Sequence, residues 1–435
     1  MNLRQFRRLD DRVYLHRGTP GDWLARHSAS CAAAAEFGAD GTNEISKSLF
    51  WRTSDERNIA IAIDHVGHQS GETAGPDGET FAGISEDVFG YARYLRDDVR
   101  SGEYRHGPAR VIRVPKASGI GTRPIHILNF SDRVMHRAVV QVIAPLLENV
   151  FGSCLIYGGR PGKSREHALA MAEFLSSQQR PVWLCEDLAD AFEHVPQRRL
   201  LDIANKYMPA PDFGELLEKM IITERRIGLR QGPGSSPPLL NLFLFHHLDR
   251  RWTKQPAPLL RYVDDLLVLC RTCDEAIQMR EELKRILEPT GMRLKQGNGG
   301  ATTFKNLHEG NTAKWLGFQI RAGSDGFHFG ASVAQRWKEK LALLAAEGAT
   351  PAEVGSRILN LAAQLGPTYE HQKPPKCHAW VVKTIAACGL TGVPLYEEFY
   401  RTWRGSYLRW QRIRHETRAV AIADDPTLAD ACGGT

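Results

Sequence analysis

The chain has 435 residues, enough for about two to three domain-sized units with a substantial core. Its composition is that of a globular protein, and its formal charge of +6 is compatible with a polyanionic partner without proving one. The charged N-terminal residues exclude a signal peptide, and no apolar run approaches the roughly 18 to 20 residues that a membrane helix needs. Eight scattered cysteines form no disulfide framework, so the sequence predicts a cytoplasmic protein without a membrane segment.

Residues 1–105 are the least informative part of the chain. Small and apolar residues predict a short helix that ends at Gly38, and apolar residues at helical spacing predict another over residues 81–100. Residues 68–83 are rich in Gly, Ser, Thr, Asp and Pro, and they predict a loop before the second helix.

The pattern becomes clearer from residue 110. Alternating residues predict a β-hairpin with strands over 110–116 and 122–128, with Lys116 and Arg123 beside its tip. An amphipathic helix is expected over 132–151, and a buried strand over 181–187 ends on Asp187. Further along, we expect helices over 200–222 and 273–287, a loop that runs into a helix over 229–248, and a strand over 314–320.

Two adjacent aspartates, Asp264 and Asp265, lie between the apolar runs of the segment Arg261–Leu269. The segment predicts a tight β-hairpin with the carboxylates at its turn. Two neighbouring carboxylates raise each other's pKa, and a fold keeps them readily if a divalent cation neutralises them. An isolated Asp-Asp turn is more often a surface turn without a role, so this interpretation depends on the other motifs.

After Gly330 the pattern is helical, with helices expected over 333–346, 351–365 and 394–418. Strands in the middle of the chain and helices at its end predict an α+β core followed by a helical unit. The last helix interleaves aromatic residues with arginines; such aromatics are more often core, while arginines on the opposite face, such as Arg404 and Arg412, could follow a nucleic-acid backbone. Residues 421–435 predict a disordered tail.

Several motifs together resemble those of reverse transcriptases. They are Asp187-Leu-Ala-Asp-Ala-Phe192, Gln231-Gly-Pro-Gly-Ser-Ser-Pro-Pro238 and Tyr262-Val-Asp-Asp265, preceded by the basic hairpin. Val114-Pro-Lys-x-x-Gly-x-x-x-Arg-Pro124, Asp132-Arg-Val134 and Tyr157-Gly-Gly-Arg-Pro-Gly-Lys-Ser164 are similar, more narrowly, to the group II intron-like branch of bacterial reverse transcriptases. The resemblance covers about residues 105–330, with motifs in the family's order and spacing.

The resemblance implies a right-hand polymerase fold of the α+β class, with fingers and palm around an antiparallel sheet and a helical thumb. The expected parts are an N-terminal extension with the start of the fingers (1–105), fingers (106–180), palm with the catalytic motifs (181–330), thumb (331–420) and tail (421–435).

The resemblance also implies roles for individual residues. The catalytic carboxylates, which would hold two Mg²⁺ ions or alternatively Mn²⁺, match Asp187, Asp264 and Asp265. The nucleotide contacts match Lys116, Arg123, Phe192, Gln231 and Gly232, and the ring of Phe192 would exclude a 2′-hydroxyl. Trp315-Leu-Gly-Phe318 resembles the strand pair that holds the primer end, and nucleic-acid contacts are expected from Trp315, Gly317, Arg404 and Arg412. The chain departs from its relatives between Gly291 and Trp315, which leaves open whether Lys295 or Lys305 is the general acid.

The implied activity is RNA-directed DNA synthesis, in which a primer 3′-hydroxyl attacks the α-phosphate of a dNTP on an RNA template to give cDNA. No fused endonuclease motif follows the thumb, and the unfamiliar N-terminus favours a stand-alone enzyme that copies a partner non-coding RNA in antiphage defence. A retroelement enzyme (group II intron-like, retron or diversity-generating) is the main alternative. Phe192 argues against an RNA-dependent RNA polymerase, and the three aspartates argue against a non-catalytic RNA scaffold. Template identity, priming and oligomeric state stay open.

Overall fold

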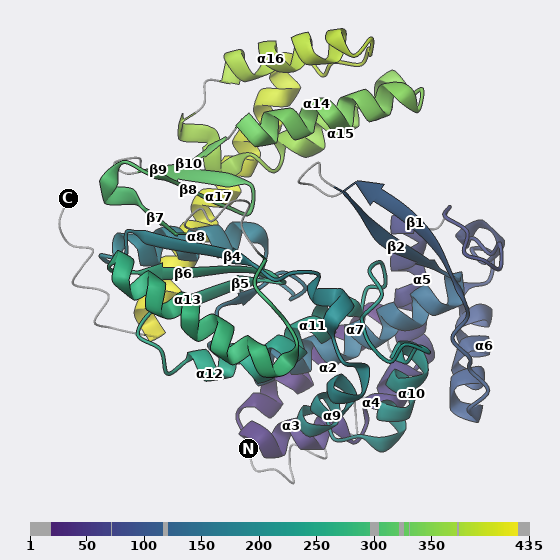
Figure 1. Cartoon of the computed structure of the whole chain (residues 1–435). Coiled ribbons are helices and arrows are strands. Elements are labelled where there is room, and N and C mark those ends of the chain that lie inside the picture. Colours follow the sequence, from purple (N-terminus) through teal and green to yellow (C-terminus); the bar gives the residue numbers. More distant parts are fainter. Residues whose placement is uncertain are drawn as a thin grey trace. The chain divides into compact units, whose positions relative to one another are not determined.

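The computed structural model describes residues 19–70, 72–115, 121–295, 304–321, 326–329, 331–371 and 374–424 (Figure 1). The chain forms two compact units, each built from separate segments. The first unit comprises Met1–Gly162, Ala189–Thr253 and Ile286–Arg293, and the second comprises Lys163–Leu188, Lys254–Arg285 and Leu294–Thr435. Helices and antiparallel strands occur in both units, which confirms the predicted α+β class.

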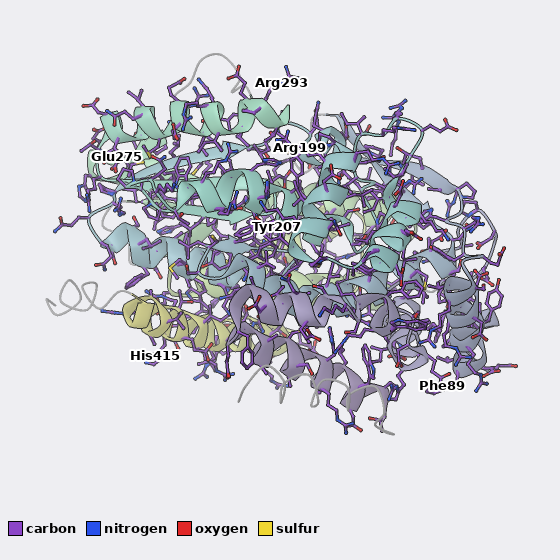
Figure 2. The ribbon with its side chains drawn as sticks, turned by 90° about the horizontal axis from the view of Figure 1, so that it is seen from below. Phe89, Arg199, Tyr207, Glu275, Arg293 and His415 are labelled. Carbon is purple, nitrogen blue, oxygen red and sulfur yellow. The ribbon has the colours of Figure 1, made fainter. Side chains whose placement is uncertain are left out.

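The N-terminal part of the first unit is helical. Its elements are α2 (Pro20–Ala35), α3 (Gly38–Ser46), α4 (Leu49–Thr53), α5 (Glu56–Ser70), η1 (Phe81–Gly83) and α6 (Val88–Ser101). The helix expected over 81–100 begins only at Val88, because the Asp87 carboxylate caps it by accepting a hydrogen bond from the Gly90 N–H at 2.7 Å. The short helix expected before Gly38 is the C-terminal part of α2. Phe89 of α6 points into solvent (Figure 2).

The hairpin and the long helix that follow confirm the prediction. β1 (Ala109–Pro115) pairs antiparallel with β2 (Thr122–Leu128), and α7 (Phe130–Phe151) is the core helix of this unit. Helices α2, α4 and α5 pack against α7. By length and composition α7 could cross a membrane, contrary to our expectation that no apolar run is long enough; 67% of its most apolar stretch is buried inside the protein, as expected for a core helix.

The first unit also contains β3 (Ile156–Tyr157), η2 (Ala191–His194), α9 (Gln197–Tyr207), α10 (Pro211–Ile221), α11 (Ser236–Leu244), the π-helical turn η3 (Phe245–Asp249), α12 (Arg250–Trp252) and η4 (Glu288–Thr290). The helix expected over 200–222 is two helices. Pro209 lies in the interruption, and Pro211 is the first residue of α10, where a missing N–H costs nothing.

The second unit is organised around antiparallel strands. β4 (Val182–Asp187), β5 (Leu259–Tyr262), β6 (Asp265–Cys270) and β7 (Phe304–Asn306) lie in the order β5-β6-β4-β7. Strand β6 is buried from Leu266 to Cys270, as its unbroken apolar run predicts. α8 (Arg165–Ser177) packs against β5 and β6, and α13 (Cys273–Leu287) follows β6.

A second sheet in this unit contains the segment 314–320, which the apolar pattern predicted as one strand and the family resemblance as a strand pair; the strand pair is confirmed. The sheet has the order β10 (Phe327–Phe329), β9 (Phe318–Arg321), β8 (Thr312–Trp315). Leu316 and Gly317 form a two-residue turn between β8 and β9, with φ angles of 48° and 85°. Positive φ at both central positions is the signature of a type I′ hairpin turn. The dipeptide Leu-Gly does not predict such a turn, which favours Asn-Gly or Asp-Gly.

The C-terminal helices are α14 (Ala331–Ala346), α15 (Pro351–Ala362), η7 (Gly366–His371), α16 (Pro374–Ala387) and α17 (Tyr396–Asp424). The sequence interpretation missed α16, whose paired prolines resemble a loop although proline fits the first turn of a helix. It also placed residues 421–424 in a tail, whereas they belong to α17; the other tail residues, 425–435, lie outside the described part of the chain.

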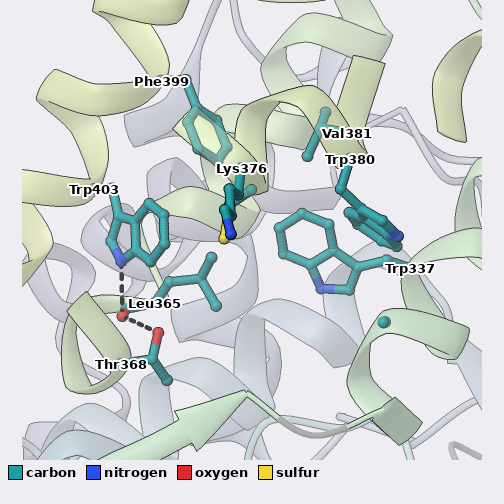
Figure 3. A pocket seen from close by; sticks show the side chains of 10 residues that line it. Trp337, Leu365, Thr368, Lys376, Trp380, Val381, Phe399 and Trp403 are labelled. Atoms are coloured by element: carbon teal, nitrogen blue, oxygen red, sulfur yellow. Dashed lines mark hydrogen bonds between the residues drawn. The ribbon is translucent and has the colours of Figure 1, made fainter. Parts of the chain in front are cut away.

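Aromatic side chains form much of the core of these helices. Trp337, Trp380, Phe399 and Trp403 line a cavity of about 270 Å³, and the Trp403 indole N–H donates to the Leu365 carbonyl at 2.9 Å (Figure 3). None of the predicted site residues lines this cavity, so we assign it to helix packing rather than to catalysis.

Candidate active site

Antiparallel pairing of β4 and β6 brings the three predicted catalytic carboxylates to one end of the second unit's main sheet. Asp187, the last residue of β4, lies opposite Asp265, the first residue of β6. Asp264 precedes Asp265 in the turn from β5, and its carbonyl accepts a hydrogen bond from the Leu188 N–H at 3.2 Å. All three aspartates are half-buried. Strand register alone therefore assembles residues that are far apart in the chain.

The turn that carries Asp264 has an unusual backbone. Val263 has a φ of 58° at the first central position of the two-residue turn, where glycine is usual and a β-branched residue is strained. Arg261, a fully buried arginine, donates from Nη1 to the Val263 carbonyl at 2.8 Å. Arg261 was not among the predicted site residues; a charged residue inside an otherwise apolar strand is the signal that could have identified it.

The electrostatics of the carboxylates favour a bound cation. Burial, and then the charge of Asp187, raise the pKa of Asp264 to about 6. Burial, and then the charges of Asp264 and Asp187, raise the pKa of Asp265 to about 7. Ionising both groups at neutral pH is therefore costly until positive charge is placed beside them.

One cation of the protein itself lies at this site. The Lys295 ammonium is 3.0 Å from Oδ2 of Asp187, and the Lys295 backbone N–H donates to the Asp187 carbonyl at 2.7 Å. Lys305 is an exposed residue of β7 and lies opposite Trp183 of β4. Trp183 is four residues before Asp187, so Lys305 pairs with β4 about 13 Å away from Asp187, at ~3.3 Å per residue. Of the two lysines left open by the sequence, the structure brings Lys295 to the carboxylates.

The residues fit a hard divalent ion. The donors are carboxylate oxygens, the pKa values of Asp264 and Asp265 are raised, and Asp187 already pairs with a cation. Within the described residues, no three His, Cys, Asp or Glu side chains form a ready metal cluster. Mg²⁺ does not need one, because it is commonly bound through one or two carboxylates and completes its shell with water and substrate phosphates.

The predicted nucleotide contacts lie in the first unit. Phe192 is half-buried on η2, and its carbonyl accepts a hydrogen bond from the Leu229 N–H at 2.7 Å. Leu229 is two residues before Gln231, so this bond places Phe192 beside the loop that carries Gln231 and Gly232.

That loop is also bonded to β2. The Gln231 carbonyl accepts a hydrogen bond from the His126 N–H at 2.7 Å. Gly232 has a φ of 128°, and a Cβ atom there would lie 2.4 Å from the His126 carbonyl oxygen, so only glycine fits. Arg123 is exposed on the same strand, and Lys116 lies outside the described residues. His126 was not predicted, and a histidine in an alternating strand is no signal by itself.

The predicted nucleic-acid contacts differ in exposure. The Trp315 side chain is buried, and its indole N–H has no hydrogen-bond partner among the residues that the structure describes, whereas Gly317 is exposed in the β8–β9 turn. On α17, Arg404 and Arg412 are exposed while Phe399 and Trp403 are buried, in agreement with the two-sided interpretation of this helix. Two neighbouring arginines are paired with α8 instead: Arg409 with Glu166 at 3.3 Å and Arg414 with Glu173 at 2.7 Å.

Comparison with known proteins identifies the central part of the chain. Residues 114–320 match the family "Reverse transcriptase (RNA-dependent DNA polymerase)". Protein YkfC of Escherichia coli (strain K12) is 26% identical over 295 residues, 57% of this chain and 77% of that protein. The group II intron-encoded protein LtrA of Lactococcus lactis is 24% identical over 193 residues, 42% of this chain and 31% of its own length.

A putative COX1/OXI3 intron 2 protein of Saccharomyces cerevisiae is 25% identical over 215 residues, 47% of this chain and 24% of its own length. The chain thus spans about a quarter to a third of the two intron proteins. Two solved structures are also similar. A partial Cas6-RT-Cas1–Cas2 complex shares 16% identity over 55% of this chain and 42% of its own, with a TM-score of 0.33. The apo telomerase of Candida tropicalis shares 12% sequence identity, and the match covers 56% of this chain and 60% of that chain, with a TM-score of 0.36.

The sequence matches confirm the resemblance seen in the motifs, and the α+β fold agrees with them. Residues 114–320 are therefore a reverse transcriptase domain, the domain of an RNA-directed DNA polymerase, of the group II intron-like branch.

Proposed function

We propose that this protein synthesises cDNA from dNTPs on an RNA template, with two Mg²⁺ ions held by Asp187, Asp264 and Asp265. The supporting observation is the convergence of these carboxylates and Lys295 at the ends of β4 and β6. When bound, the ions would neutralise charge on the substrate phosphates and lower the pKa of the attacking 3′-hydroxyl. Mn²⁺, which takes the same oxygen ligands, is the expected substitute.

The protein's own residues would do the remaining work. Arg261 holds the turn so that the Asp264 and Asp265 carboxylates keep their positions. We assign the general-acid role to Lys295, whose ammonium could give a proton to the departing pyrophosphate, and not to Lys305. Phe192 would lie beneath the incoming sugar and exclude the 2′-hydroxyl, and Lys116, Arg123, Gln231 and Gly232 would contact the nucleotide.

The nucleic-acid contacts are assigned to two places in the second unit. Trp315 and Gly317 form the end of the β8–β9 hairpin, which we propose holds the primer end. Because the Trp315 side chain is buried, its contribution would be to shape the turn, and the backbone at Gly317 would make the contact. The exposed Arg404 and Arg412 would bind phosphates of the template–primer duplex.

We further propose that the template is a dedicated non-coding RNA and that the cytoplasmic enzyme acts in antiphage defence. The helices α2 to α6 support this proposal, because they precede the family match at residue 114 and form a substantial part of the first unit outside that match. A retroelement enzyme is the alternative, since two of the relatives are named as intron proteins.

A single experiment tests both the polymerase activity and the dedicated RNA template. The protein is purified from cells that carry its native locus, the bound RNA is sequenced, and dNTPs are added with Mg²⁺, with the Asp264→Ala, Asp265→Ala double variant in parallel. Discrete cDNA complementary to one bound RNA, absent in the variant, would support a dedicated template and lead to a phage challenge. Extension of any supplied primer–template without bound RNA would favour a retroelement enzyme. No synthesis under either condition would contradict the polymerase proposal.

A further inference from the structure

A buried chain of hydrogen bonds in the first unit ends beside the Gln231–Gly232 loop. Ser235 Oγ is 2.6 Å from Nδ1 of His136 on α7. Nε2 of His136 is 3.2 Å from Nε2 of His106, and Nδ1 of His106 is 2.8 Å from the Gly107 carbonyl oxygen. His136 and Ser235 are 3% and 2% exposed, so these groups cannot exchange their partners for water without opening the core.

The distances define one direction for the protons. Nδ1 of His106 lies 2.8 Å from the Gly107 carbonyl, which only accepts, and 3.4 Å from Nη1 of Arg230. The shorter contact places a hydrogen on Nδ1, so Nε2 of this neutral ring accepts. His136 must then donate from Nε2, which leaves its Nδ1 as the acceptor for the Ser235 hydroxyl. The hydrogen bonds run from Ser235 through His136 and His106 to Gly107. In this arrangement both imidazoles are neutral, and each link has one donor and one acceptor.

The surroundings keep both rings neutral. Burial, then His106 and Arg230, lower the pKa of His136 well below its usual value. Burial lowers the pKa of His106 despite the opposing effect of Asp132, and Arg230 lowers it further. Asp132 is held by the Tyr104 hydroxyl at 2.7 Å and by the Gly107 N–H at 3.0 Å. The titratable and charged groups around the two rings are thus Asp132, Tyr104 and Arg230.

The loop is held at both ends. Ser235 anchors one end through His136, and the Ser236 hydroxyl donates to the Arg230 carbonyl at 2.6 Å across the base of the loop. Between these anchors, the Gln231 carbonyl accepts a hydrogen bond from the His126 N–H of β2, and Gly232 requires close approach of the two backbones. A loss of the Ser235 anchor would therefore let the loop move relative to β2.

We propose that Ser235 and His136 are positioning residues for nucleotide binding: through the hydrogen bond between them they hold the Gln231–Gly232 loop where the incoming dNTP contacts it, and His106 and Gly107 fix the direction of that bond. This inference rests on the proposed polymerase function, because it takes Gln231 and Gly232 as nucleotide contacts. It assigns a role to two histidines that the family motifs do not single out.

Two substitutions of His136 distinguish its hydrogen bond to Ser235 from its hydrogen bond to His106. In His136→Asn, the Asn side-chain oxygen can replace Nδ1 as the acceptor for Ser235, and the contact with His106 is lost. In His136→Gln, the amide nitrogen can replace Nε2 as the donor to His106, and the bond to Ser235 is lost. Ser235→Ala removes the same bond from the other side, and Ser235→Thr restores a hydroxyl.

We expect Ser235→Ala and His136→Gln to raise the KM for dNTP about tenfold, as loss of a buried hydrogen bond allows, with a much smaller change in kcat. His136→Asn and Ser235→Thr should stay within about threefold of the wild type. The double variant Ser235→Ala, His136→Gln should be no worse than either single variant, because both remove one interaction. Amide hydrogen exchange over residues 229–236 should accelerate in the same variants, and it is measured without dNTP.

His27→Asn is the matched control. His27 is also a buried histidine bonded to α7, through the Val142 carbonyl at 2.8 Å, but it has no bond to the loop. It should lower the unfolding midpoint and leave the KM for dNTP unchanged. If Ser235→Ala and His136→Gln behave like this control, the chain is only structural and the inference fails. A wild-type protein that incorporates no dNTP would instead contradict the proposed function, and the exchange data would still report on the loop.

Discussion

The carboxylate hairpin of the second unit and the nucleotide loop of the first unit are built in different ways. The carboxylates meet because β4 and β6 pair in one register, which places Asp187 opposite Asp265 through backbone hydrogen bonds. The loop at Gln231 and Gly232 is held by buried side chains from distant segments, among them His136 and His106. Backbone pairing tolerates changes of side chain, whereas a hydrogen bond between two side chains is lost when either residue is replaced. A single substitution should therefore inactivate the carboxylate hairpin without moving it. In the nucleotide loop, a single substitution should move the loop without removing a reacting group.

The largest effect should come from the carboxylates. Asp264→Asn keeps the shape of the side chain and removes its charge, so we expect the rate of dNTP incorporation to fall by at least about 10³-fold. The variant should be as stable as the wild type or more stable, because repulsion with Asp265 and Asp187 is relieved. Primer-extension rates and thermal unfolding measure the two effects. Retained activity would exclude Asp264 from the catalytic site.

The next largest effect concerns the choice of sugar. Phe192→Ala should improve the use of ribonucleotides relative to deoxynucleotides by about 10²-fold, because the ring that excludes the 2′-hydroxyl is gone. Its half-buried position suggests that folding survives the change. Single-nucleotide incorporation with each sugar gives the ratio of kcat/KM values. An unchanged ratio would assign Phe192 to packing against the loop rather than to selection.

Lys295→Met should reduce kcat by about 100-fold, at the lower end of the range for a lost general acid. Lys305→Met serves as the matched control, since Lys305 is an exposed lysine on the same sheet and lies opposite Trp183. It should change kcat by less than about twofold. Pre-steady-state incorporation separates this step from product release. Equal effects of the two substitutions would remove Lys295 from the mechanism.

In the nucleotide loop, Gly232→Ala should raise the KM for dNTP about tenfold, because the added methyl cannot approach the His126 carbonyl and the φ of 128° is strained for alanine. Gly234→Ala is the control: a Cβ there meets nothing within 4 Å. It should change KM by less than about twofold. If both alanine variants behave alike, nucleotide binding does not depend on the close approach of the loop to β2.

The smallest effect is a pH dependence of stability. Asp264 and Asp265 have folded-state pKa values of about 6 and about 7, above the ordinary 3.8. Between about pH 4 and 7 the folded protein binds more protons than the unfolded chain, so the metal-free protein should lose stability as pH rises through this window. Denaturant unfolding in a chelator measures the slope. Mg²⁺ should restore stability above pH 7 in the wild type and not in Asp264→Asn.

Part of this site was readable from the sequence because its signals are local. The order of the motifs and the alternation of β1 and β2 identified Asp187, Asp264, Asp265 and the basic hairpin. The reverse transcriptase resemblance that they carried is confirmed by the family match over residues 114–320, and its group II intron-like character by the similarity to the two intron proteins. Errors occurred where a local signal has two meanings: paired prolines start α16, and Leu316-Gly317 forms a turn inside what resembled one strand.

The rest of the site depends on contacts between distant residues. No local pattern distinguishes Lys295 from Lys305, because the choice follows from which lysine the fold brings to Asp187. Arg261 and His136 likewise gain their roles from buried partners in the fold. Residue types and their spacing thus determined the polymerase chemistry of this protein, since that chemistry needs particular carboxylates at strand ends. Only the tertiary structure decided which other side chains support them, because burial and hydrogen-bond partners arise from packing and not from sequence neighbours.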